Sequence, residues 1–350
     1  MSKITRRRIY LGMDVHKKTY SITAICEGDI IKRACMPADP IALLNFIKNH
    51  FPNDFVKSVY EAGFSGFGLH RFLIKNGVDN IVVHAASIEI AANARSKTDK
   101  RDSKKMAEQL YAGRLKCIHI PSPQRERWRA VTRLRGSFVK EKSRIACKLK
   151  SLMFYFGLIP HNQVKRTSRK LINELLISKF DGDTGYCIKE YCKAWIHNDN
   201  VIKNIEKRLA LQAKQDNFIG DVYKDIPGVG LMSARILANE LGDMLHFTSE
   251  KALYCFTGLT PREVSSGESI HLGNITHQGN PMIRQILVQN AWRAIRKSKE
   301  YALVFERIAK NTSRKKAILG IARRMLGHAR AIMKKKKENI CCREITHALT

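Results

Sequence analysis

The sequence lacks the cysteine patterns that hold zinc. It contains nine cysteines, but none forms a CxxC pair and none lies in a Cys/His cluster with the spacing of a zinc site. Such cysteines are typical of reduced thiols, several of them buried. We therefore expect neither structural disulfides nor structural zinc.

Long apolar runs are also missing. No stretch of about 18 apolar residues could span a bilayer, and the N-terminus does not join a charged segment to an apolar stretch of signal-peptide length. These absences predict a soluble, cytoplasmic protein without a membrane partner.

Acidic residues are scarce compared with basic ones. The chain has 350 residues with 31 Asp and Glu against 63 Lys and Arg, which gives a formal net charge of +32. Positive charge spread along a whole chain is typical of nucleic-acid-binding proteins. Hydrophobic residues make up 44%, too many for a disordered basic chain. The composition therefore predicts a folded protein of two or three domains that binds a polyanion.

Residues 1–121 predict a mixed α/β domain. Three short strands occupy residues 8–37, with turn residues between them. A helix, a strand at FVKSVYEA, a second helix, a strand at NIVVHAA and a helix from near Asp102 follow. This order of strands and helices is typical of the ribonuclease H-like fold.

Residues 122–215 predict long amphipathic helices that form a helical hairpin or coiled-coil arm. Between Arg125 and Lys150 there are ten basic residues and only two acidic ones, Glu126 and Glu141. They indicate either contact with nucleic acid, which we favour, or a solvated face of the kind that most charge-rich helices have.

Residues 216–300 begin with a glycine-containing turn between two helical segments. Gly228 and Gly230 in this turn resemble a helix-hairpin-helix element, whose backbone N–H groups approach a phosphate. A helix-helix corner that only packs is the alternative.

Residues 301–350 predict basic C-terminal helices, whose apolar face either packs on the earlier domains or belongs to a plain terminal helix with a solvated tail.

Four acidic residues are placed so that they can meet at one edge of the predicted sheet. Asp14 ends the first strand and Glu61 ends the fourth, and these strands are neighbours in a ribonuclease H-like sheet. Asp99 and Asp102, three apart at a helix start, can point toward that edge. Clustered carboxylates need cations, and hard oxygen ligands suit Mg²⁺ or Mn²⁺, which can act in pairs on phosphoryl groups. Helix capping by Asp99 and Asp102 and a turn role for Asp14 are the simpler alternatives.

The two aspartates lie within the basic segment SKTDKRDSKK. Its cations would receive the nucleic-acid strand on which the metals act. These cations are Lys97, Lys100, Arg101, Lys104 and Lys105.

A second group of candidate residues lies in the turn-rich stretch of residues 255–284. Serine hydroxyls can attack a phosphodiester when they are activated and when cations stabilise the crowded phosphorus, although most loop serines do not. The serines are Ser265, Ser266 and Ser269, flanked by Arg262, His271, His277 and Arg284.

These motifs together resemble the DEDD transposases of bacterial insertion sequences, a family related to pilin-inverting recombinases. Asp14, Glu61, Asp99 and Asp102 resemble the DEDD tetrad of its RuvC-like ribonuclease H domain. The segments IPGVG, FTGLTP, SSG and LGNITHQGNP resemble its second, transposase domain. The resemblance covers almost the whole chain in the right order.

The resemblance implies that Ser266, directly before the glycine of the SG step, is a nucleophile that forms a phosphoserine link to DNA. It implies a site composed from two subunits, dimers or tetramers joined through the arm, and a structured guide RNA (bridge RNA) that pairs with donor and target DNA. It also implies a bacterial, nucleoid-associated enzyme. One departure is Ser103, where the family commonly has alanine, and a first-turn serine should be tolerated there.

Two other functions fit parts of this pattern. A RuvC-like junction endonuclease would use metal-activated water and leave Ser266 as a turn residue. A non-catalytic scaffold would bind RNA or DNA with its basic residues, and its acids would only cap helices. The absence of a recognisable sequence-reading helix agrees with RNA guidance.

Overall fold

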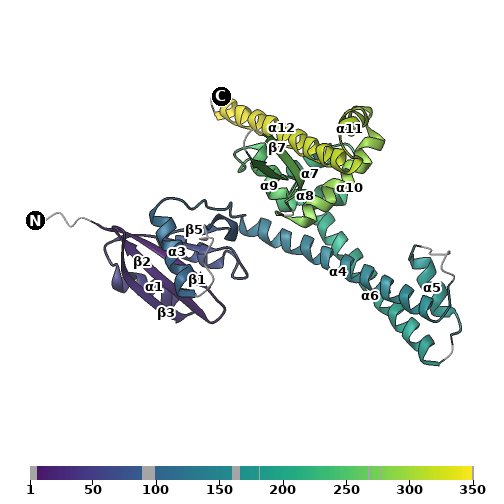
Figure 1. Cartoon of the computed structure of the whole chain (residues 1–350), viewed down its shortest axis with the longest axis horizontal. Helices are drawn as coiled ribbons and strands as arrows, with labels where there is room; N and C mark the ends of the chain where they lie inside the picture. The colour runs from purple at the N-terminus through teal and green to yellow at the C-terminus, as the bar shows by residue number, and fades with distance from the viewer. Residues whose placement is uncertain are drawn as a thin grey trace, which may run out of the picture. The chain divides into compact units, whose positions relative to one another are not determined.

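The computed structural model describes residues 6–88, 99–159, 166–180, 182–266, 269–276 and 278–348. Side chains are not described at positions 99–100, 217–218, 263–266, 269–272 and 339–348. The chain divides into two compact units, Met1–Ile120 and Pro121–Thr350, and each is described by itself (Figure 1). Within the described ranges, no helix is both long enough and apolar enough to cross a membrane.

The first unit is built on a five-stranded sheet with the order β3-β2-β1-β4-β5. β1, β2 and β3 are antiparallel, whereas β4 runs parallel to β1 and to β5. The predicted succession of strands and helices is present. The elements are β1 (Arg8–Val15), β2 (Thr19–Cys26), β3 (Asp29–Pro37), α1 (Pro40–His50), β4 (Phe55–Glu61), α2 (Gly68–Lys75), β5 (Asp79–Val83), a short 3₁₀ turn (Ala85–Ser87) and α3 (Asp99–Tyr111).

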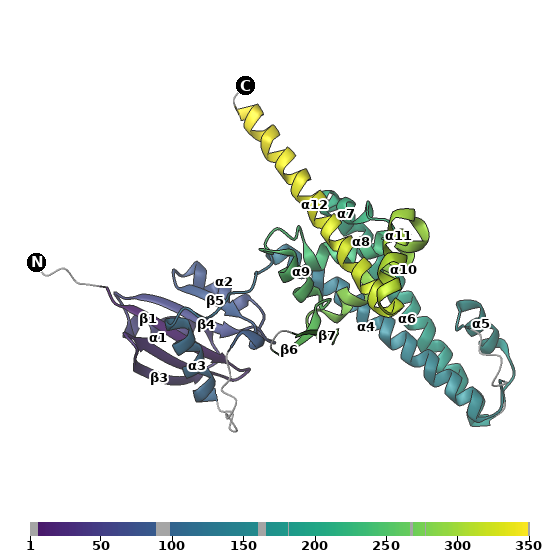
Figure 2. The same ribbon diagram turned by 45° about the horizontal axis from the view of Figure 1, so that its top comes forward.

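Helices cover both faces of this sheet (Figure 2). On one face, Ile9, Leu11 and Met13 of β1 pack in a core with residues of α1 and α2, including Leu43 and Leu73. The alternation of buried residues along a strand requires the intervening residues to face the other side. On that side, α3 packs on the sheet through Met106 and Leu110.

The contact between α3 and β1 depends on Gly12. A Cβ atom at Gly12 would lie 2.1 Å from the carbonyl oxygen of Ser103 and 2.4 Å from the backbone nitrogen of Ala107. The helix backbone therefore lies directly on the strand. Ser103 is buried, and its hydroxyl lies 3.0 Å from that of Thr23, which pairs with Gly12 across the sheet. Ser103 thus has a hydrogen-bonding partner, which agrees with the expectation that a serine is tolerated there.

The second unit is almost entirely helical. It contains α4 (Pro123–Tyr155), α5 (Arg169–Ile177), α6 (Gly182–Gln215), α7 (Asn217–Lys224), α8 (Leu231–Leu241), α9 (Glu250–Thr257), β6 (Pro261–Ser266), β7 (Ser269–Ile275), α10 (Pro281–Lys297), α11 (Lys299–Asn311) and α12 (Arg314–Ala348). We expected a turn-rich stretch around the serines, and the structure instead has an antiparallel hairpin of β6 and β7 there.

The long helices α4 and α6 form a hairpin with α5 beside its far end (Figure 1). Ion pairs join α4 to α6 at Arg135–Glu206 and Lys142–Asp199, and Arg125 of α4 pairs with Asp216, the residue just after α6. From Arg125 to Lys142 the residue numbers in α4 rise by the same amount as the numbers of their partners fall. The two helices are therefore antiparallel in a constant register. Apolar residues such as Met153 and Cys192 form a separate core near the far end.

The remaining helices share a single core. Residues of α12, including Ile318, Ile321 and Met325, are buried in the same cluster as Leu237 of α8 and Leu287 of α10. The apolar face of the C-terminal helix therefore returns to the helices that precede it, which was one of the two alternatives. The energy of this burial comes from many apolar contacts spread over α7 to α12.

The cysteines differ in part from expectation. Of the seven whose side chains are described, Cys26 and Cys192 are buried and the other five are exposed. We expected several buried cysteines, and among those described only these two are buried. Burial raises the pKa of Cys192 to about 11, so this thiol remains protonated near neutral pH.

We expect Gly12→Ala to lower the free energy of unfolding by about 1–3 kcal/mol, because the new methyl group forces α3 away from β1. Gly68→Ala is the matched control, since no atom lies within 4 Å of the Cβ position at Gly68 in α2. Urea unfolding followed by circular dichroism measures both. Equal urea midpoints for Gly12→Ala and Gly68→Ala would contradict a close contact between α3 and β1.

Candidate functional site

Strand register places two of the predicted acidic residues side by side. Met13 pairs with Tyr60 in the parallel β1–β4 ladder, so the next residues, Asp14 and Glu61, are level with each other. Neighbouring strands lie about 4.8 Å apart. Gly12 and Val59, two residues earlier, face α3, so Asp14 and Glu61 emerge on the same side of the sheet as this helix.

The direction of α3 brings its first turn to the same edge. The ring of Tyr111, at the end of α3, lies 5.3 Å from that of Tyr10 near the start of β1. Ser103 lies over Gly12, so the helix runs antiparallel to β1. The first turn, which holds Asp99 and the half-buried Asp102, therefore lies toward the end of β1 that carries Asp14. The side chain of Asp99 lies outside the described residues.

The donor atoms at this edge suit a hard cation, but the described side chains do not surround a common point. Among the side chains that the structure describes, no group of three or more His, Cys, Asp or Glu residues lies close enough to hold a metal ion. Asp14 and Glu61 offer carboxylate oxygens on one face, which is the ligand chemistry that Mg²⁺ and Mn²⁺ prefer. The residue types and their common edge therefore fit such an ion.

His16 is a neighbour of this edge that sequence reasoning missed. Its Nε2 atom lies 3.2 Å from Oδ2 of Asp14, and its side chain is 47% exposed compared with 19% for Asp14. The sequence gives only a weak signal for this contact, because a histidine in the β1–β2 turn has no fixed spacing to the acidic residues. The contact orients the Asp14 carboxylate in this structure.

The basic segment around the aspartates is described in part. Arg101 is exposed, and Lys104 and Lys105 are half-exposed. Lys104 also lies 3.4 Å from Glu108 one turn later on α3. Lys97 and the side chain of Lys100 lie outside the described residues.

The serines lie at the closed end of the β6–β7 hairpin. Ser266 is the last residue of β6 and pairs with Ser269, and Ser265 pairs with Ile270. The side chains of these serines and of His271 lie outside the described residues, as does His277 altogether. Arg262, near the start of β6, is exposed. The structure thus places Ser266 at a hairpin end rather than in an irregular loop.

Arg284 holds the base of this hairpin together. Its Nη1 atom donates to the carbonyl oxygens of Gly258, before β6, and Gln278, after β7, at 3.4 and 3.2 Å. A Cβ atom at Gly258, where φ is +69°, would lie 2.2 Å from this nitrogen. We predicted Arg284 as a nucleic-acid contact, and the described geometry gives it a structural role.

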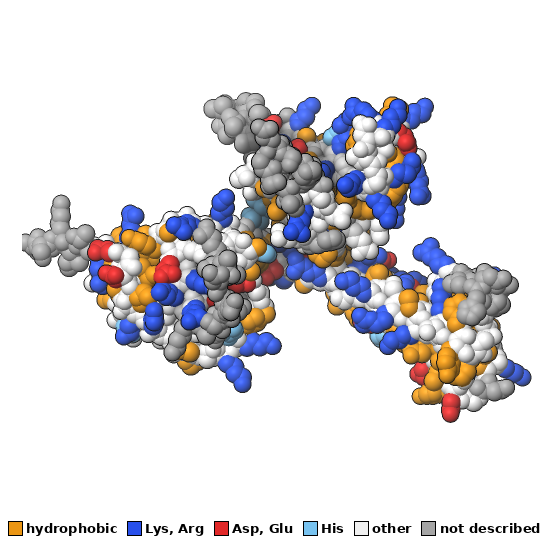
Figure 3. Space-filling model, viewed as in Figure 1, with side chains coloured by type: hydrophobic (Ala, Val, Ile, Leu, Met, Phe, Trp, Pro, Cys, Tyr) orange, Lys and Arg blue, Asp and Glu red, His pale blue; other side chains and the backbone are white. Residues whose placement is uncertain are grey.

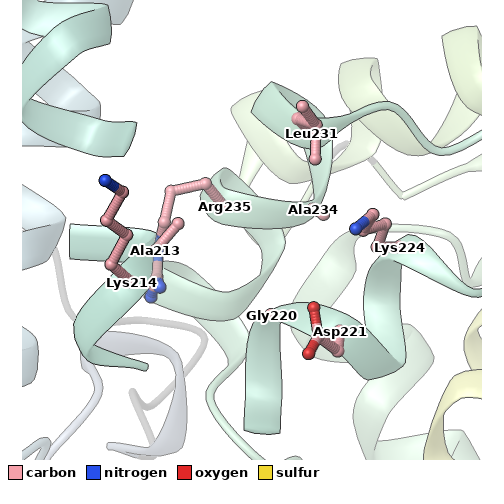
Figure 4. Close-up of a pocket in the computed structure, with 8 residues that line it drawn as sticks. All are labelled: Ala213, Lys214, Gly220, Asp221, Lys224, Leu231, Ala234 and Arg235. Atoms are coloured by element: carbon pink, nitrogen blue, oxygen red, sulfur yellow. The ribbon is translucent and has the colours of Figure 1, made fainter. Parts of the chain in front are cut away.

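The two glycines of the α7–α8 turn have different roles. Gly228 is buried with φ +86°, and a Cβ there would lie 2.5 Å from the backbone nitrogen of Ala294 in α10. This glycine therefore packs, as the simpler alternative stated. Gly230 is exposed at the N-cap of α8 and is followed by Leu231, which is 72% exposed. Beside them lies a hollow of about 190 Å³, whose lining includes Lys224 (Figure 4).

Most of the basic residues between Arg125 and Lys150 have internal partners. Arg129 donates to the carbonyl oxygens of Asn239 and Glu240 at the end of α8, at 3.0 and 2.8 Å. Arg133 donates to both carboxylate oxygens of Glu240 at 3.1 Å. Arg125, Arg135 and Lys142 pair with acids outside α4, and Arg127 and Arg144 bond to Gln124 and Glu141 within it, so seven of the ten have a partner in the fold. The helix face is therefore largely structural, and Lys140 and Lys148 are exposed.

The guanidinium groups at the base of the arm are electrostatically coupled to Glu240. Burial lowers the pKa of Arg129, and the nearby Glu240 charge opposes this change. The hydrogen bond from Arg133 to Glu240 raises the pKa of Arg133. Glu240 is 1% exposed and also accepts from Nδ2 of Asn280 at 3.3 Å.

Two family models match the chain. One is the model of IS110-type DEDD transposases, which matches residues 11–156, and the other is the IS116/IS110/IS902 transposase family, which matches residues 221–305. They cover the unit that carries the acidic edge and the region that carries the serine hairpin.

Curated relatives agree with both matches. The protein y4rJ of Sinorhizobium fredii, named as a candidate transposase, is 26% identical over 91% of this chain and 90% of its own length. A second S. fredii protein of the same description, y4qE, is 26% identical over 82% of this chain and 72% of its own. The transposase of the insertion sequence IS1111A from Coxiella burnetii is 26% identical over 57% of this chain and 56% of its own.

The protein is thus a transposase, an enzyme that acts on DNA. It belongs to the IS110/IS116 family of DEDD transposases.

We expect Glu240→Gln to lower the free energy of unfolding by about 1–3 kcal/mol, because it removes a buried acceptor from Arg133. Glu206→Gln, at a more exposed ion pair with Arg135, should cost less than about 1 kcal/mol. Urea unfolding of the two variants provides the measurement. A larger loss for Glu206→Gln would contradict this ranking.

Proposed function

We propose that the protein moves an insertion sequence by cutting and rejoining DNA with a DEDD metal site and a serine nucleophile. The observation that carries this proposal is the β1–β4 register together with the direction of α3. These bring Asp14, Glu61 and the turn with Asp99 and Asp102 to one edge. A metal site requires such a common edge, whereas separate capping or turn residues do not.

The first unit is proposed to be a RuvC-like ribonuclease H domain. The sheet order β3-β2-β1-β4-β5, with three antiparallel strands followed by two parallel ones, supports this fold. In this sheet the adjacent strands β1 and β4 carry the first two acids. The strand ends then form a fixed platform for charged groups.

The four acids would hold Mg²⁺ or Mn²⁺, which when bound supplies a Lewis acid for the phosphodiester. The Ser266 hydroxyl attacks the phosphorus atom and loses its proton. The new serine–phosphorus bond forms as the bond to the leaving DNA oxygen breaks, and that oxygen gains a proton. Attack on the phosphoserine by another DNA hydroxyl reverses these steps and joins new strands.

Several features support the assembly that this reaction needs. The hairpin presents Ser266 at its closed end and is braced at its base by Arg284. The arm of α4 and α6 presents exposed aromatic residues near its far end, such as Tyr155 and Tyr186. We therefore propose dimers or tetramers joined through the arm, with each site built from two subunits. A guide RNA, together with location at the bacterial nucleoid in the cytoplasm, completes the proposal.

A denaturing-gel assay with labelled element-end DNA, RNA from the flanks of the gene and Mg²⁺ tests the chemistry. We expect a covalent protein–DNA adduct with the wild type and none with Ser266→Ala or Asp102→Asn, because each variant removes one required group. Ser265→Ala and Ser269→Ala are the matched controls and should keep the adduct.

Two outcomes would contradict the proposal. Cleavage that persists in Ser266→Ala without an adduct, but is lost in Asp102→Asn, would identify a water-using junction nuclease. DNA binding without cleavage by any protein, unchanged when Asp99 and Asp102 are both replaced by Asn, would identify a basic scaffold.

The α7–α8 turn is proposed as a contact for duplex DNA. We expect Lys224→Gln to weaken duplex binding and to reduce the slope of log K against log salt by about 0.9, because one phosphate contact is lost. Lys48→Gln, at an exposed position of α1, removes the same charge elsewhere and is the control. Fluorescence anisotropy over a salt series measures both, and equal slopes would remove the turn from the DNA surface.

A further inference from the structure

The outward face of α10 is a second basic surface, separate from every residue considered above. Its inward face is buried through residues such as Ile283, Leu287 and Ala294. On the opposite side, an open hollow of about 520 Å³ is lined by Gln289, Trp292, Arg293 and Arg296. These positions recur every three or four residues, so they form one stripe along the helix.

The two arginines of this stripe have no acidic partner within the described part of the chain. Arg293 and Arg296 are exposed, and no described side chain forms an ion pair or hydrogen bond with them. This differs from the arm, where Arg133 and Arg135 are held by Glu240 and Glu206. Their charge is therefore available to an external anion.

The acids on neighbouring α11 are already paired. Glu300 lies 2.9 Å from Arg324, and Glu306 lies 3.6 Å from Arg314. Lysine and arginine side chains stand out over α11 in the space-filling view (Figure 3). The field around the hollow is thus positive and attracts polyanions.

Trp292 adds a flat aromatic surface between these charges. Its ring meets Phe305 of α11 edge to face, with centroids 5.7 Å apart and an interplanar angle of 62°. Phe305 is 1% exposed, and the guanidinium of Arg314 lies 4.9 Å from its ring centre. The indole is therefore anchored on the core of α11 while it lines the hollow.

We propose that this hollow binds a single-stranded segment of nucleic acid. A base stacks on Trp292, and Arg293 and Arg296 hold the flanking phosphates. Arginine forks suit phosphate oxygens, and an aromatic ring among cations is the usual platform for unpaired bases. A base inside a duplex cannot reach the indole, so the occupant is a strand with splayed bases, from RNA or from opened DNA. The inference rests on the proposed function only in supposing that such strands are present.

Binding is measured with full-length Asp102→Asn protein, so that cleavage does not interfere. The probes are fluorescent oligouridylate and oligothymidylate of about 12 nucleotides and a duplex of equal length. Arg293→Gln/Arg296→Gln should weaken single-strand binding by about tenfold and reduce the salt slope by about 1.4, because two phosphate contacts are lost. Lys32→Gln/Arg33→Gln, at exposed positions of β3, removes the same charge and should have little effect.

The stacking role has its own test. Trp292→Ala should weaken single-strand binding by about tenfold with an unchanged salt slope, and Trp292→Tyr should restore most of the affinity. Melting temperatures of both variants identify any loss of folding. Better binding of either oligonucleotide supports the inference and tells whether RNA or DNA occupies the hollow.

Three results would overturn the inference. The first is an arginine double variant that binds single strands as tightly as the Lys32/Arg33 control. The second is a folded Trp292→Tyr protein that binds them as weakly as Trp292→Ala. The third is a loss of duplex affinity in these variants that equals their loss of single-strand affinity. A missing adduct in the gel assay together with intact oligonucleotide binding would remove the serine mechanism and leave this surface in place.

Discussion

The close contact of α3 with β1 over Gly12 is the constraint on which the acidic edge depends. The helix backbone lies where the side chain of any other residue would be, so its height above the sheet is fixed. The contact at Ser103 and Ala107 also fixes the position of the helix along the strand. Asp102 is one residue before this contact and Asp14 is two residues beyond Gly12, so steric packing determines where both acids lie.

Such rigidity matters for the proposed site because carboxylates that lie close together repel one another when they are ionised. A sheet edge and a helix start that are held by buried contacts cannot move apart to relieve this repulsion. The buried hydrogen bond between Ser103 and Thr23 adds to the restraint from the opposite side of Gly12. In the proposed function, a divalent cation would balance this charge.

Much of the first unit could be predicted from the sequence, because its strands are short, apolar and bounded by turn residues. The positions of Asp14 and Glu61 followed from the strand ends, which the register of β1 and β4 makes adjacent. The contact of His16 with Asp14 could not be predicted, because it depends on the conformation of a turn. The β6–β7 hairpin was missed because its serines and glycines favour turns more strongly than strands.

The basic residues show the limit of reasoning from charge alone. Composition indicates how much positive charge is present, but not whether an acid or carbonyl on another helix neutralises it. Arg129, Arg133 and Arg284 support the fold, whereas Arg293 and Arg296 do not contact any described acid. Only tertiary structure separates these groups, because the sequence does not reveal which partner each guanidinium meets.

Glu240 links three parts of the second unit through one buried carboxylate. It accepts from Arg133 of the arm and from Asn280, whose side chain also caps the start of α10. The backbone nitrogen of Asn280 donates in turn to Phe256, just before the β6–β7 hairpin. The base of the arm, the base of the hairpin and the start of α10 are therefore held by one hydrogen-bonded group. A buried charge is stable only when all of its partners are present, so these three parts must be assembled together.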